Sequence, residues 1–184
     1  KESKVVIYGG NYLDDNSEAM FRYLLENTDY KIVCIADSLL KYEMRSNVII
    51  KKNTYLNALN ELITCSVLID SSFHTIKLKP TKKQLFIQCW HGSPIKRMVI
   101  DSSNSAYYSK FFNPAKIFEN HMKAYFHASK DQMVCLGYPR NDYLFRKIRE
   151  VEGYIDKSKN NIIWMPTFRH GLGQNESSID LPII

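Results

Sequence analysis

The segment Lys4-Val5-Val6-Ile7-Tyr8-Gly9-Gly10 decides the fold class of this chain of 184 residues. Its short apolar run stops at two glycines, a pattern typical of a buried strand that turns into a loop. Further short apolar runs follow at residues 32–36, 48–50, 67–69 and 85–89, and we expect each to form a strand.

Amphipathic segments alternate with these runs. We expect Asn16 or Ser17 to cap one helix, and Asn53 or Thr54 to cap a second whose apolar face includes Leu62. Short apolar runs that alternate with amphipathic helices predict an α/β protein with a parallel sheet covered by helices.

The later part of the chain predicts two more helices and a domain boundary. Asn113 and Asn141 are expected to cap these helices, the second of which carries Leu144 and Phe145 inward. A polar, charged stretch follows, and a new apolar run starts at residues 162–165. We therefore expect an N-terminal domain at 1–152, a linker at 153–161 and a truncated second domain at 162–184.

The composition indicates a folded protein with an anionic partner, but it does not identify that partner. Apolar residues make up 45% of the chain and charged residues 24%, as in a folded soluble protein. The 25 basic and 19 acidic residues leave a net charge of +6, which favours an anionic partner such as a nucleotide, a nucleic acid, a polyphosphate or an acidic membrane surface.

The cysteines and the apolar runs indicate the cellular setting. Four cysteines lie far apart without metal-site spacing, and Cys34, Cys89 and Cys135 stand in apolar runs where a small buried side chain is expected. This predicts a reducing, cytoplasmic protein without disulfides or zinc. Since no apolar run approaches the roughly 18 residues of a membrane span, any membrane contact is expected to be peripheral.

Three polar clusters follow predicted strands, where open α/β sheets place their ligands. In the first, at residues 88–97, His91 is a candidate for proton transfer and Gly92 allows a ligand to approach the backbone. The amide of Ser93, together with Lys96 and Arg97, would form an anion site. A hydrogen-bonded core histidine followed by an ordinary turn is the alternative.

The second cluster is Gly137-Tyr138-Pro139-Arg140-Asn141-Asp142, in which Arg140 can grip a phosphate with two nitrogens. A plain turn with a solvated Arg–Asp pair is the alternative. The third cluster spans residues 164–171, where Thr167 and Arg169 are candidates for phosphate binding or parts of a structural turn. Four lysines precede the strand before His91 and either form a solvated face or steer an anionic acceptor: Lys77, Lys79, Lys82 and Lys83.

Together these clusters resemble the CDP-glycerol glycerophosphotransferase family of teichoic-acid and capsule synthesis. Residues 90–96 are similar to the family pattern Trp-His-Gly-Thr-Pro-Leu-Lys, with Ser93 in place of threonine. Residues 137–142 match Gly-Tyr-Pro-Arg-Asn-Asp, residues 166–169 match Pro-Thr-Phe/Trp-Arg, and residues 15–21 resemble the family's Asp-Asn-Ser/Pro-x-Ala-Leu-Phe opening. The resemblance spans roughly residues 4–170.

The resemblance implies a glycosyltransferase-B architecture of two Rossmann-like halves, each a parallel sheet with helices on both faces. This chain would be the acceptor-side half with only the opening strand of the CDP-binding half, and we expect it to be inactive alone. The implied reaction moves glycerol phosphate or ribitol phosphate from a CDP-polyol to the hydroxyl end of a teichoic acid or capsule-type polymer and releases CMP.

The resemblance also implies roles and partners. His91 would be the catalytic base, and no metal or other cofactor is expected. The acceptor would be a lipid-linked polyol phosphate or glycan at the inner face of the cell membrane, with no nucleic acid as partner. The residues implied to bind phosphate or substrate are Gly92, Ser93, Lys96, Arg97, Arg140, Asn141, Asp142, Thr167 and Arg169.

Two other functions stay open at this point. A nucleotide-sugar glycosyltransferase shares the fold and a basic cleft, and its released nucleotide (UDP or GDP in place of CMP) would distinguish it. A non-catalytic module that binds nucleic acid or an anionic polymer is less favoured, because the basic residues form neither an arginine-rich helix nor an aromatic RNA-binding motif.

Overall fold

The computed structural model describes residues 3–13, 15–38, 45–72, 76–92, 102–145, 158–160 and 162. Internal contacts divide the chain into a first unit at residues 1–145 and a second at 146–184. Every described helix and strand lies in the first unit. The expected boundary at residue 152 stays a prediction, because residues 146–157 are outside the described ranges, as is the expected strand at 162–165 except for Ile162.

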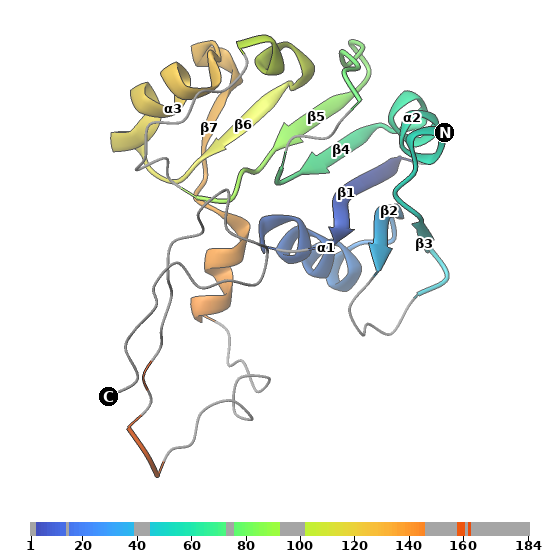
Figure 1. Cartoon of the computed structure of the whole chain (residues 1–184), viewed down its shortest axis with the longest axis horizontal. Helices are drawn as coiled ribbons and strands as arrows, with labels where there is room; N and C mark the ends of the chain where they lie inside the picture. The colour runs from blue at the N-terminus through green and yellow to red at the C-terminus, as the bar shows by residue number, and fades with distance from the viewer. Residues whose placement is uncertain are drawn as a thin grey trace, which may run out of the picture. The chain divides into compact units, whose positions relative to one another are not determined.

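Seven parallel strands form the sheet of the described chain, in the order β3-β2-β1-β4-β5-β6-β7 (Figure 1). The five expected strands are confirmed, and β6 and β7 are additional. The order reverses between β1 and β4, and doubly wound sheets bind ligands beside such a reversal. The bounds are β1 Lys4–Tyr12, β2 Lys31–Ser38, β3 Val48–Lys51, β4 Val67–Asp70, β5 Leu85–Gln88, β6 Lys110–Asn113 and β7 Met133–Cys135.

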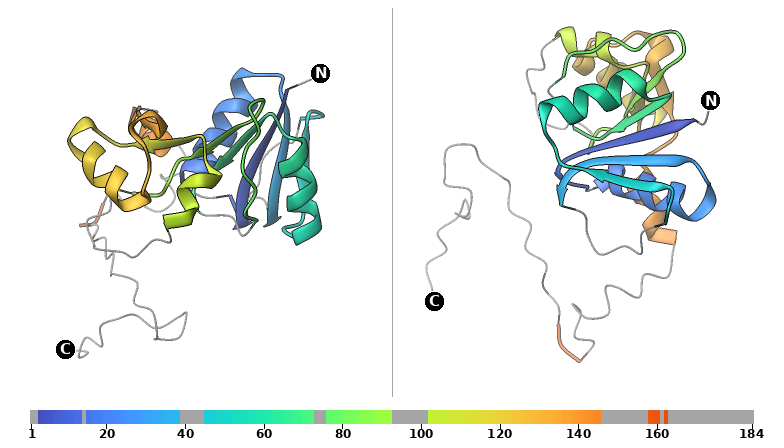
Figure 2. Two further views of the ribbon diagram at one scale, coloured as in Figure 1. Left: turned by 90° about the horizontal axis from the view of Figure 1, so that it is seen from above. Right: turned by 90° about the vertical axis from the view of Figure 1, so that its right-hand side faces the viewer.

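Helices cover both faces of this sheet, as Figures 1 and 2 show. Helix α1 lies on one face, and α2 and α3 lie on the other. The α-helices are α1 Asp15–Asn27, α2 Tyr55–Thr64 and α3 Glu119–Phe126, and the 3₁₀ turns are η1 Ser102–Tyr107, η2 Lys116–Phe118, η3 Lys130–Gln132 and η4 Pro139–Phe145.

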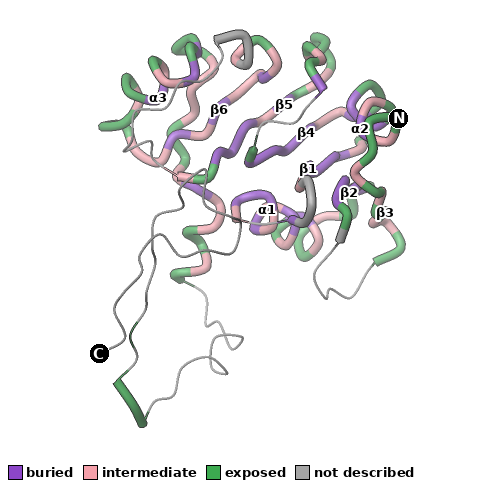
Figure 3. Tube along the Cα trace, in the orientation of Figure 1, coloured by how far each residue is buried: buried purple, intermediate pink, exposed green. Residues whose placement is uncertain are grey.

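Alternate residues of β1 enter two hydrophobic clusters, because successive side chains of a strand point to opposite faces. Val5 packs in one cluster with Phe21 of α1. Val6 packs in the other with Leu62 of α2 and Phe126 of α3. Figure 3 shows buried residues along the central strands, between these two layers of helix. The predicted helix-covered parallel sheet is therefore confirmed.

The expected helix caps are only partly confirmed. Thr54 caps α2 by accepting a hydrogen bond from the Asn57 N–H at 3.3 Å. Asn16 and Ser17 do not precede α1 but lie buried inside its first turn, since the helix already begins at Asp15.

The other two expected caps are wrong. Asn113 ends β6, where it pairs with Cys135 and its carbonyl accepts from the Gly137 N–H, so its backbone continues the sheet. Asn141 lies within η4, and its N–H donates to the Tyr138 carbonyl. Leu144 and Phe145, expected to face inward, are exposed.

Cys34 lies in β2 and Cys135 in β7, whereas Cys65 follows α2 and Cys89 follows β5. Cys34 and Cys89 are buried as expected, whereas Cys135 is exposed because it ends β7, the last strand of the sheet. All four thiols are free. Burial raises the pKa of Cys34 to about 12 and that of Cys65 to about 11, so both thiols are protonated at neutral pH. Within the described ranges, no helix has the length and apolar character to cross a bilayer.

Candidate active site

Buried polar side chains gather at the carboxyl ends of the central strands. Asp70 ends β4, Gln88 ends β5 and Asn113 ends β6, and all three are fully buried. Asn16 and Ser17, also fully buried, lie in the first turn of α1, which follows β1. Burying polar groups is costly unless they are hydrogen-bonded, so their concentration at the ligand-binding edge of the sheet marks the candidate site.

Trp90 has an unusual backbone conformation at this edge. Its φ is 56°, in the left-handed region, which costs a bulky residue about 1–2 kcal/mol. Two buried side chains form hydrogen bonds with its backbone N–H and carbonyl. The Gln88 Oε1 accepts from the Trp90 N–H at 2.8 Å, and the Asn16 Nδ2 donates to the Trp90 carbonyl at 2.5 Å. The Trp90 backbone is thus fixed from both sides.

The Trp90 indole supports His91. It packs edge-on against Phe126 of α3, with ring centroids 5.0 Å apart, and against Tyr125 at 5.8 Å. The imidazole of His91 stacks on the indole with centroids 3.9 Å apart and an angle of 29° between the planes. Because His91 itself is exposed, its ring is held on a buried platform yet remains accessible to a ligand.

Arg140 of η4 reaches the same loop. Its Nη1 lies 2.5 Å from the Oδ1 of Asp15, and its guanidinium carbon lies 5.6 Å from the centre of the Tyr138 ring. Its Nη2 lies beside Gly92, where a methyl group on the glycine would stand 3.8 Å away. The first two polar clusters predicted from the sequence therefore meet at Gly92.

Asn16 joins the two clusters. The carboxamide that donates to the Trp90 carbonyl also accepts from the Arg140 N–H, at 3.1 Å. Reasoning from the sequence treated Asn16 as a helix cap and missed this role. The available signal was its place in the Asp15–Phe21 stretch of the family resemblance.

Asn141 and Asp142 are exposed on η4. Their expected roles in substrate binding stay predictions. The other expected site residues lie outside the described ranges, and their roles also stay predictions: Ser93, Lys96, Arg97, Thr167 and Arg169.

Asp70 adds a buried carboxylate to the edge. Its Oδ2 accepts from the Tyr108 hydroxyl at 2.5 Å, and its Oδ1 accepts from the Ser72 N–H at 2.9 Å. Burial, then the charges of Asp70 and Asp15, raise the pKa of Cys89, so its neutral thiol is a poor nucleophile.

Some buried side-chain atoms at this edge form no hydrogen bond with the described residues. The Gln88 Nε2 and the Asn113 carboxamide have no hydrogen-bond partner within the described part of the chain. The described residues contain no group of three His, Cys, Asp or Glu that could hold a metal ion. The expectation of a metal-free reaction stays a prediction.

Two lysines of the lysine stretch, Lys82 and Lys83, lie away from this edge. Lys82 and Lys83 are exposed and precede β5, and the neighbouring Gln84 Nε2 donates to the carbonyls of Leu62 and Cys65, just before β4. These residues therefore lie at the amino ends of the strands, whereas His91 follows a carboxyl end. This position favours a solvated face over a role in steering the acceptor.

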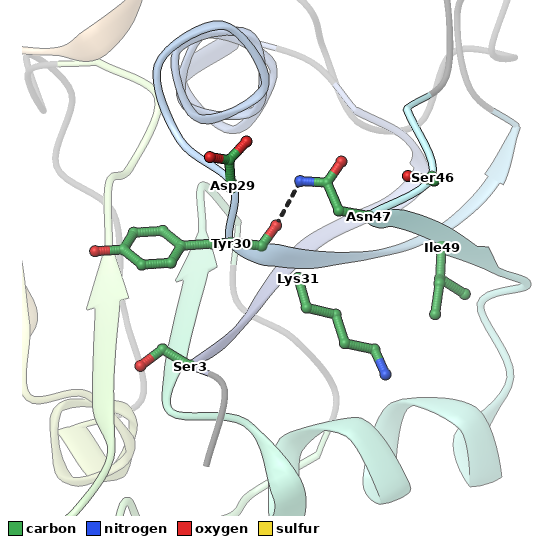
Figure 4. Close-up of a pocket in the computed structure, with 7 residues that line it drawn as sticks. All are labelled: Ser3, Asp29, Tyr30, Lys31, Ser46, Asn47 and Ile49. Carbon is green, nitrogen blue, oxygen red and sulfur yellow. Dashed lines mark hydrogen bonds between the residues drawn. The ribbon is translucent and has the colours of Figure 1, made fainter.

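A surface pocket also lies at the amino ends of the strands (Figure 4). It has a volume of about 380 Å³, and the Asn47 Nδ2 donates across it to the Tyr30 carbonyl at 2.8 Å. Lys31 begins β2 and Val48 begins β3, so the pocket is at the opposite edge from His91. We assign it no role. Its lining residues are Ser3, Asp29, Tyr30, Lys31, Ser46, Asn47 and Ile49.

The reversed strand order defines a doubly wound α/β protein. The loop that carries His91 and Gly92 (the histidine loop) meets the turn η4 that carries Arg140 (the arginine turn), and together they form a candidate anion-binding site. The family model of CDP-glycerol:poly(glycerophosphate) glycerophosphotransferase matches residues 1–183. The chain belongs to this family, which confirms the resemblance found in its motifs.

Two curated relatives illustrate the match. The chain is 24% identical to a teichoic acid poly(glycerol phosphate) polymerase of Bacillus spizizenii, over 92% of this chain and 51% of the relative. It is also 24% identical to a teichoic acid glycerol-phosphate transferase of Staphylococcus aureus, over 93% of this chain and 51% of the relative. The chain thus spans about half the length of these proteins.

Solved structures of the wall teichoic acid polymerase TagF share the fold. One variant superposes with a TM-score of 0.70 at 18% identity, covering 83% of this chain and 42% of TagF. Another, soaked with CDPG, superposes with a TM-score of 0.75 at 16% identity, covering 92% and 48%. At these identities the likeness establishes the fold.

Proposed function

We propose that this chain is the acceptor-side half of a two-domain glycosyltransferase-B type enzyme. The enzyme moves glycerol phosphate, or ribitol phosphate, from a CDP-activated donor to the hydroxyl end of a teichoic acid or capsule-type polymer. The observation that supports this most directly is the meeting of His91, Gly92 and Arg140 at one edge of the sheet, in a member of this family.

The proposed step is a direct displacement at phosphorus. The terminal hydroxyl oxygen of the acceptor attacks the β-phosphorus of the CDP-polyol, and its proton passes to the imidazole of His91. The bond between the β-phosphorus and the bridging oxygen breaks, and CMP leaves with that electron pair. The step requires no covalent intermediate on the protein.

Arg140 and the backbone at Gly92 are proposed to stabilise the charge on the phosphoryl oxygens. Asp15 holds one guanidinium nitrogen at 2.5 Å, which orients the other nitrogen beside Gly92. A guanidinium held in this way is a suitable partner for phosphate, since its planar shape matches two oxygens at once.

The location of the enzyme is part of the proposal. The net charge of +6 suits an acceptor that is itself a polyanion, and it suits peripheral contact with the anionic inner face of the cell membrane. Vesicle sedimentation of the complete protein, with and without anionic lipid, tests this contact.

Replacement of His91 tests the proposed base. In the complete natural protein that contains this chain, we expect His91→Ala to lower kcat by about 100-fold or more while the KM for CDP-glycerol changes by less than about 3-fold. His121→Ala, at an exposed position of α3, serves as the matched control and keeps normal turnover. Near-normal turnover of His91→Ala would refute the assignment.

The released nucleotide tests the class of donor. We expect CMP from CDP-glycerol or CDP-ribitol, and no UDP or GDP from nucleotide sugars. The rates with the two CDP-polyols decide between glycerol phosphate and ribitol phosphate. Release of UDP or GDP in place of CMP would favour a glycosyltransferase of the same fold.

A further inference from the structure

We propose that Asn16 is a positioning residue of this site: its carboxamide holds Trp90 in the left-handed backbone conformation and thereby sets the imidazole of His91. The inference rests on the proposed function for what the site does. The geometry that it describes is independent of that function.

The first support is the strained residue itself. Trp90 has a φ of 56°, and the Asn16 Nδ2 bonds its carbonyl at 2.5 Å. If Trp90 returned to an ordinary negative φ, its carbonyl would move away from that amide and the following residue would change direction. Since His91 is that residue and stacks on the indole at 3.9 Å, its ring position depends on the conformation of Trp90.

The second support is the chemistry of the side chain. Asn16 is fully buried, and its carboxamide donates to Trp90 while accepting from the Arg140 N–H. An aspartate in its place would keep the acceptor and lose the donor, and an alanine would lose both. A carboxamide is therefore required for both bonds, which hold the histidine loop and the arginine turn to α1.

The experiment compares Asn16→Ala and Asn16→Asp with Asn27→Ala in the complete natural protein. Asn27 lies in the last turn of the same helix, where its exposed side chain donates to the local Tyr23 carbonyl at 2.8 Å. The steady-state assay uses CDP-glycerol and includes His91→Ala in parallel. A small displacement of a catalytic group costs up to about 100-fold, so we expect Asn16→Ala to lower kcat by about 10–100-fold and to change KM by less than about 3-fold.

A spectroscopic readout follows the ring geometry without turnover. This readout uses the 184-residue chain, which has two tryptophans, Trp90 and Trp164, so that Trp164→Phe leaves Trp90 as its sole indole. A protonated imidazole quenches a stacked indole more strongly than a neutral one, so Trp90 emission should depend on pH as long as the His91 ring stays stacked on it. We expect this change to shrink by at least about half in Asn16→Ala, because the stacking requires the Trp90 conformation. His91→Ala, with no imidazole at that position, gives the baseline.

The outcomes separate this inference from the proposed function. A kcat within about 2-fold of wild type together with an undiminished emission change in Asn16→Ala would overturn the positioning role. If His91→Ala stays active, the proposed base is wrong, and the emission change alone decides the role of Asn16. If Asn16→Ala does not fold, Asn16→Asp is held to the same two criteria. Asn27→Ala keeps both wild-type values.

Discussion

At the scale of single residues, Gly92 and Gly137 of the candidate motifs are needed for different reasons. Gly137 has a φ of +82°, in the left-handed region that side chains rarely adopt. Gly92 has no such constraint, and a methyl group added to it would meet Arg140 Nη2 at 3.8 Å, an ordinary van der Waals distance. The described surroundings therefore tolerate an alanine at 92 but not readily at 137.

We therefore expect Gly92→Ala to keep the melting temperature within about 2 °C of wild type and to lower kcat/KM by at least about 10-fold, because the methyl group obstructs a ligand at the backbone. Gly137→Ala should instead cost about 1 kcal/mol of stability through its backbone conformation. Calorimetry and steady-state assays of both variants check this. Full activity of Gly92→Ala would show that no ligand approaches there.

At the scale of elements, one buried carboxylate ties α2 to the sheet. Glu61 of α2 lies 2.5 Å from the Nζ of Lys4 in β1 and 2.6 Å from the Nζ of Lys51 in β3, and its side chain is 4% exposed. Burial raises the pKa of Glu61, but hydrogen bonds and charge from the two ammonium groups outweigh it and hold the pKa below its ordinary value.

The two ion pairs of Glu61 predict a specific loss of stability in acid. Because the folded pKa of Glu61 is lowered, its contribution is present above the unfolded value of about 4.3 and disappears as the pH falls through the folded value. We expect Glu61→Gln to cost about 3 kcal/mol at pH 7 and progressively less below about pH 4.5. Urea unfolding at a series of pH values measures the difference.

The control for this prediction is Glu18→Gln. Glu18 pairs with Arg22 one turn further along α1, closer to solvent, and such pairs contribute only about 0.5 kcal/mol. A cost for Glu61→Gln as small as this, or one that does not change with pH, would show that the two lysines do not stabilise the carboxylate.

At the scale of the whole molecule, the described core belongs entirely to the first unit. Both hydrophobic clusters draw their residues from between Val5 and Tyr138. A domain of this size buries enough surface to fold by itself.

We expect a fragment of residues 1–145 to unfold in one cooperative transition, with a melting temperature within about 3 °C of the 184-residue chain. A fragment that ends at residue 109 should lose cooperativity, because it lacks Phe111, Met122 and Phe126 of the core. Circular dichroism during heating checks both. A broad transition for residues 1–145 would mean that the second unit contributes to the core.

The match between sequence and structure depends on the length of each pattern. Strands β1 to β5 were predicted because each contains a run of apolar residues. Strand β6, Lys110–Asn113, was missed because its apolar run is only Phe111 and Phe112, and β7 was missed because it spans only the three residues Met133–Cys135. The caps expected at Asn113 and Asn141 failed because their backbone groups bond to distant or preceding segments instead.

By itself, the sequence determined the α/β class, the parallel sheet with helices on both faces, the family and the two motifs that carry His91 and Arg140, because short-range periodicity and motif chemistry are written along the chain. Only the tertiary structure decided the strand order, the left-handed Trp90 and the bonds of Asn16 to Trp90 and Arg140. Those partners lie 74 and 124 residues away in the chain, and no local pattern specifies which carbonyl or amide a buried side chain will meet.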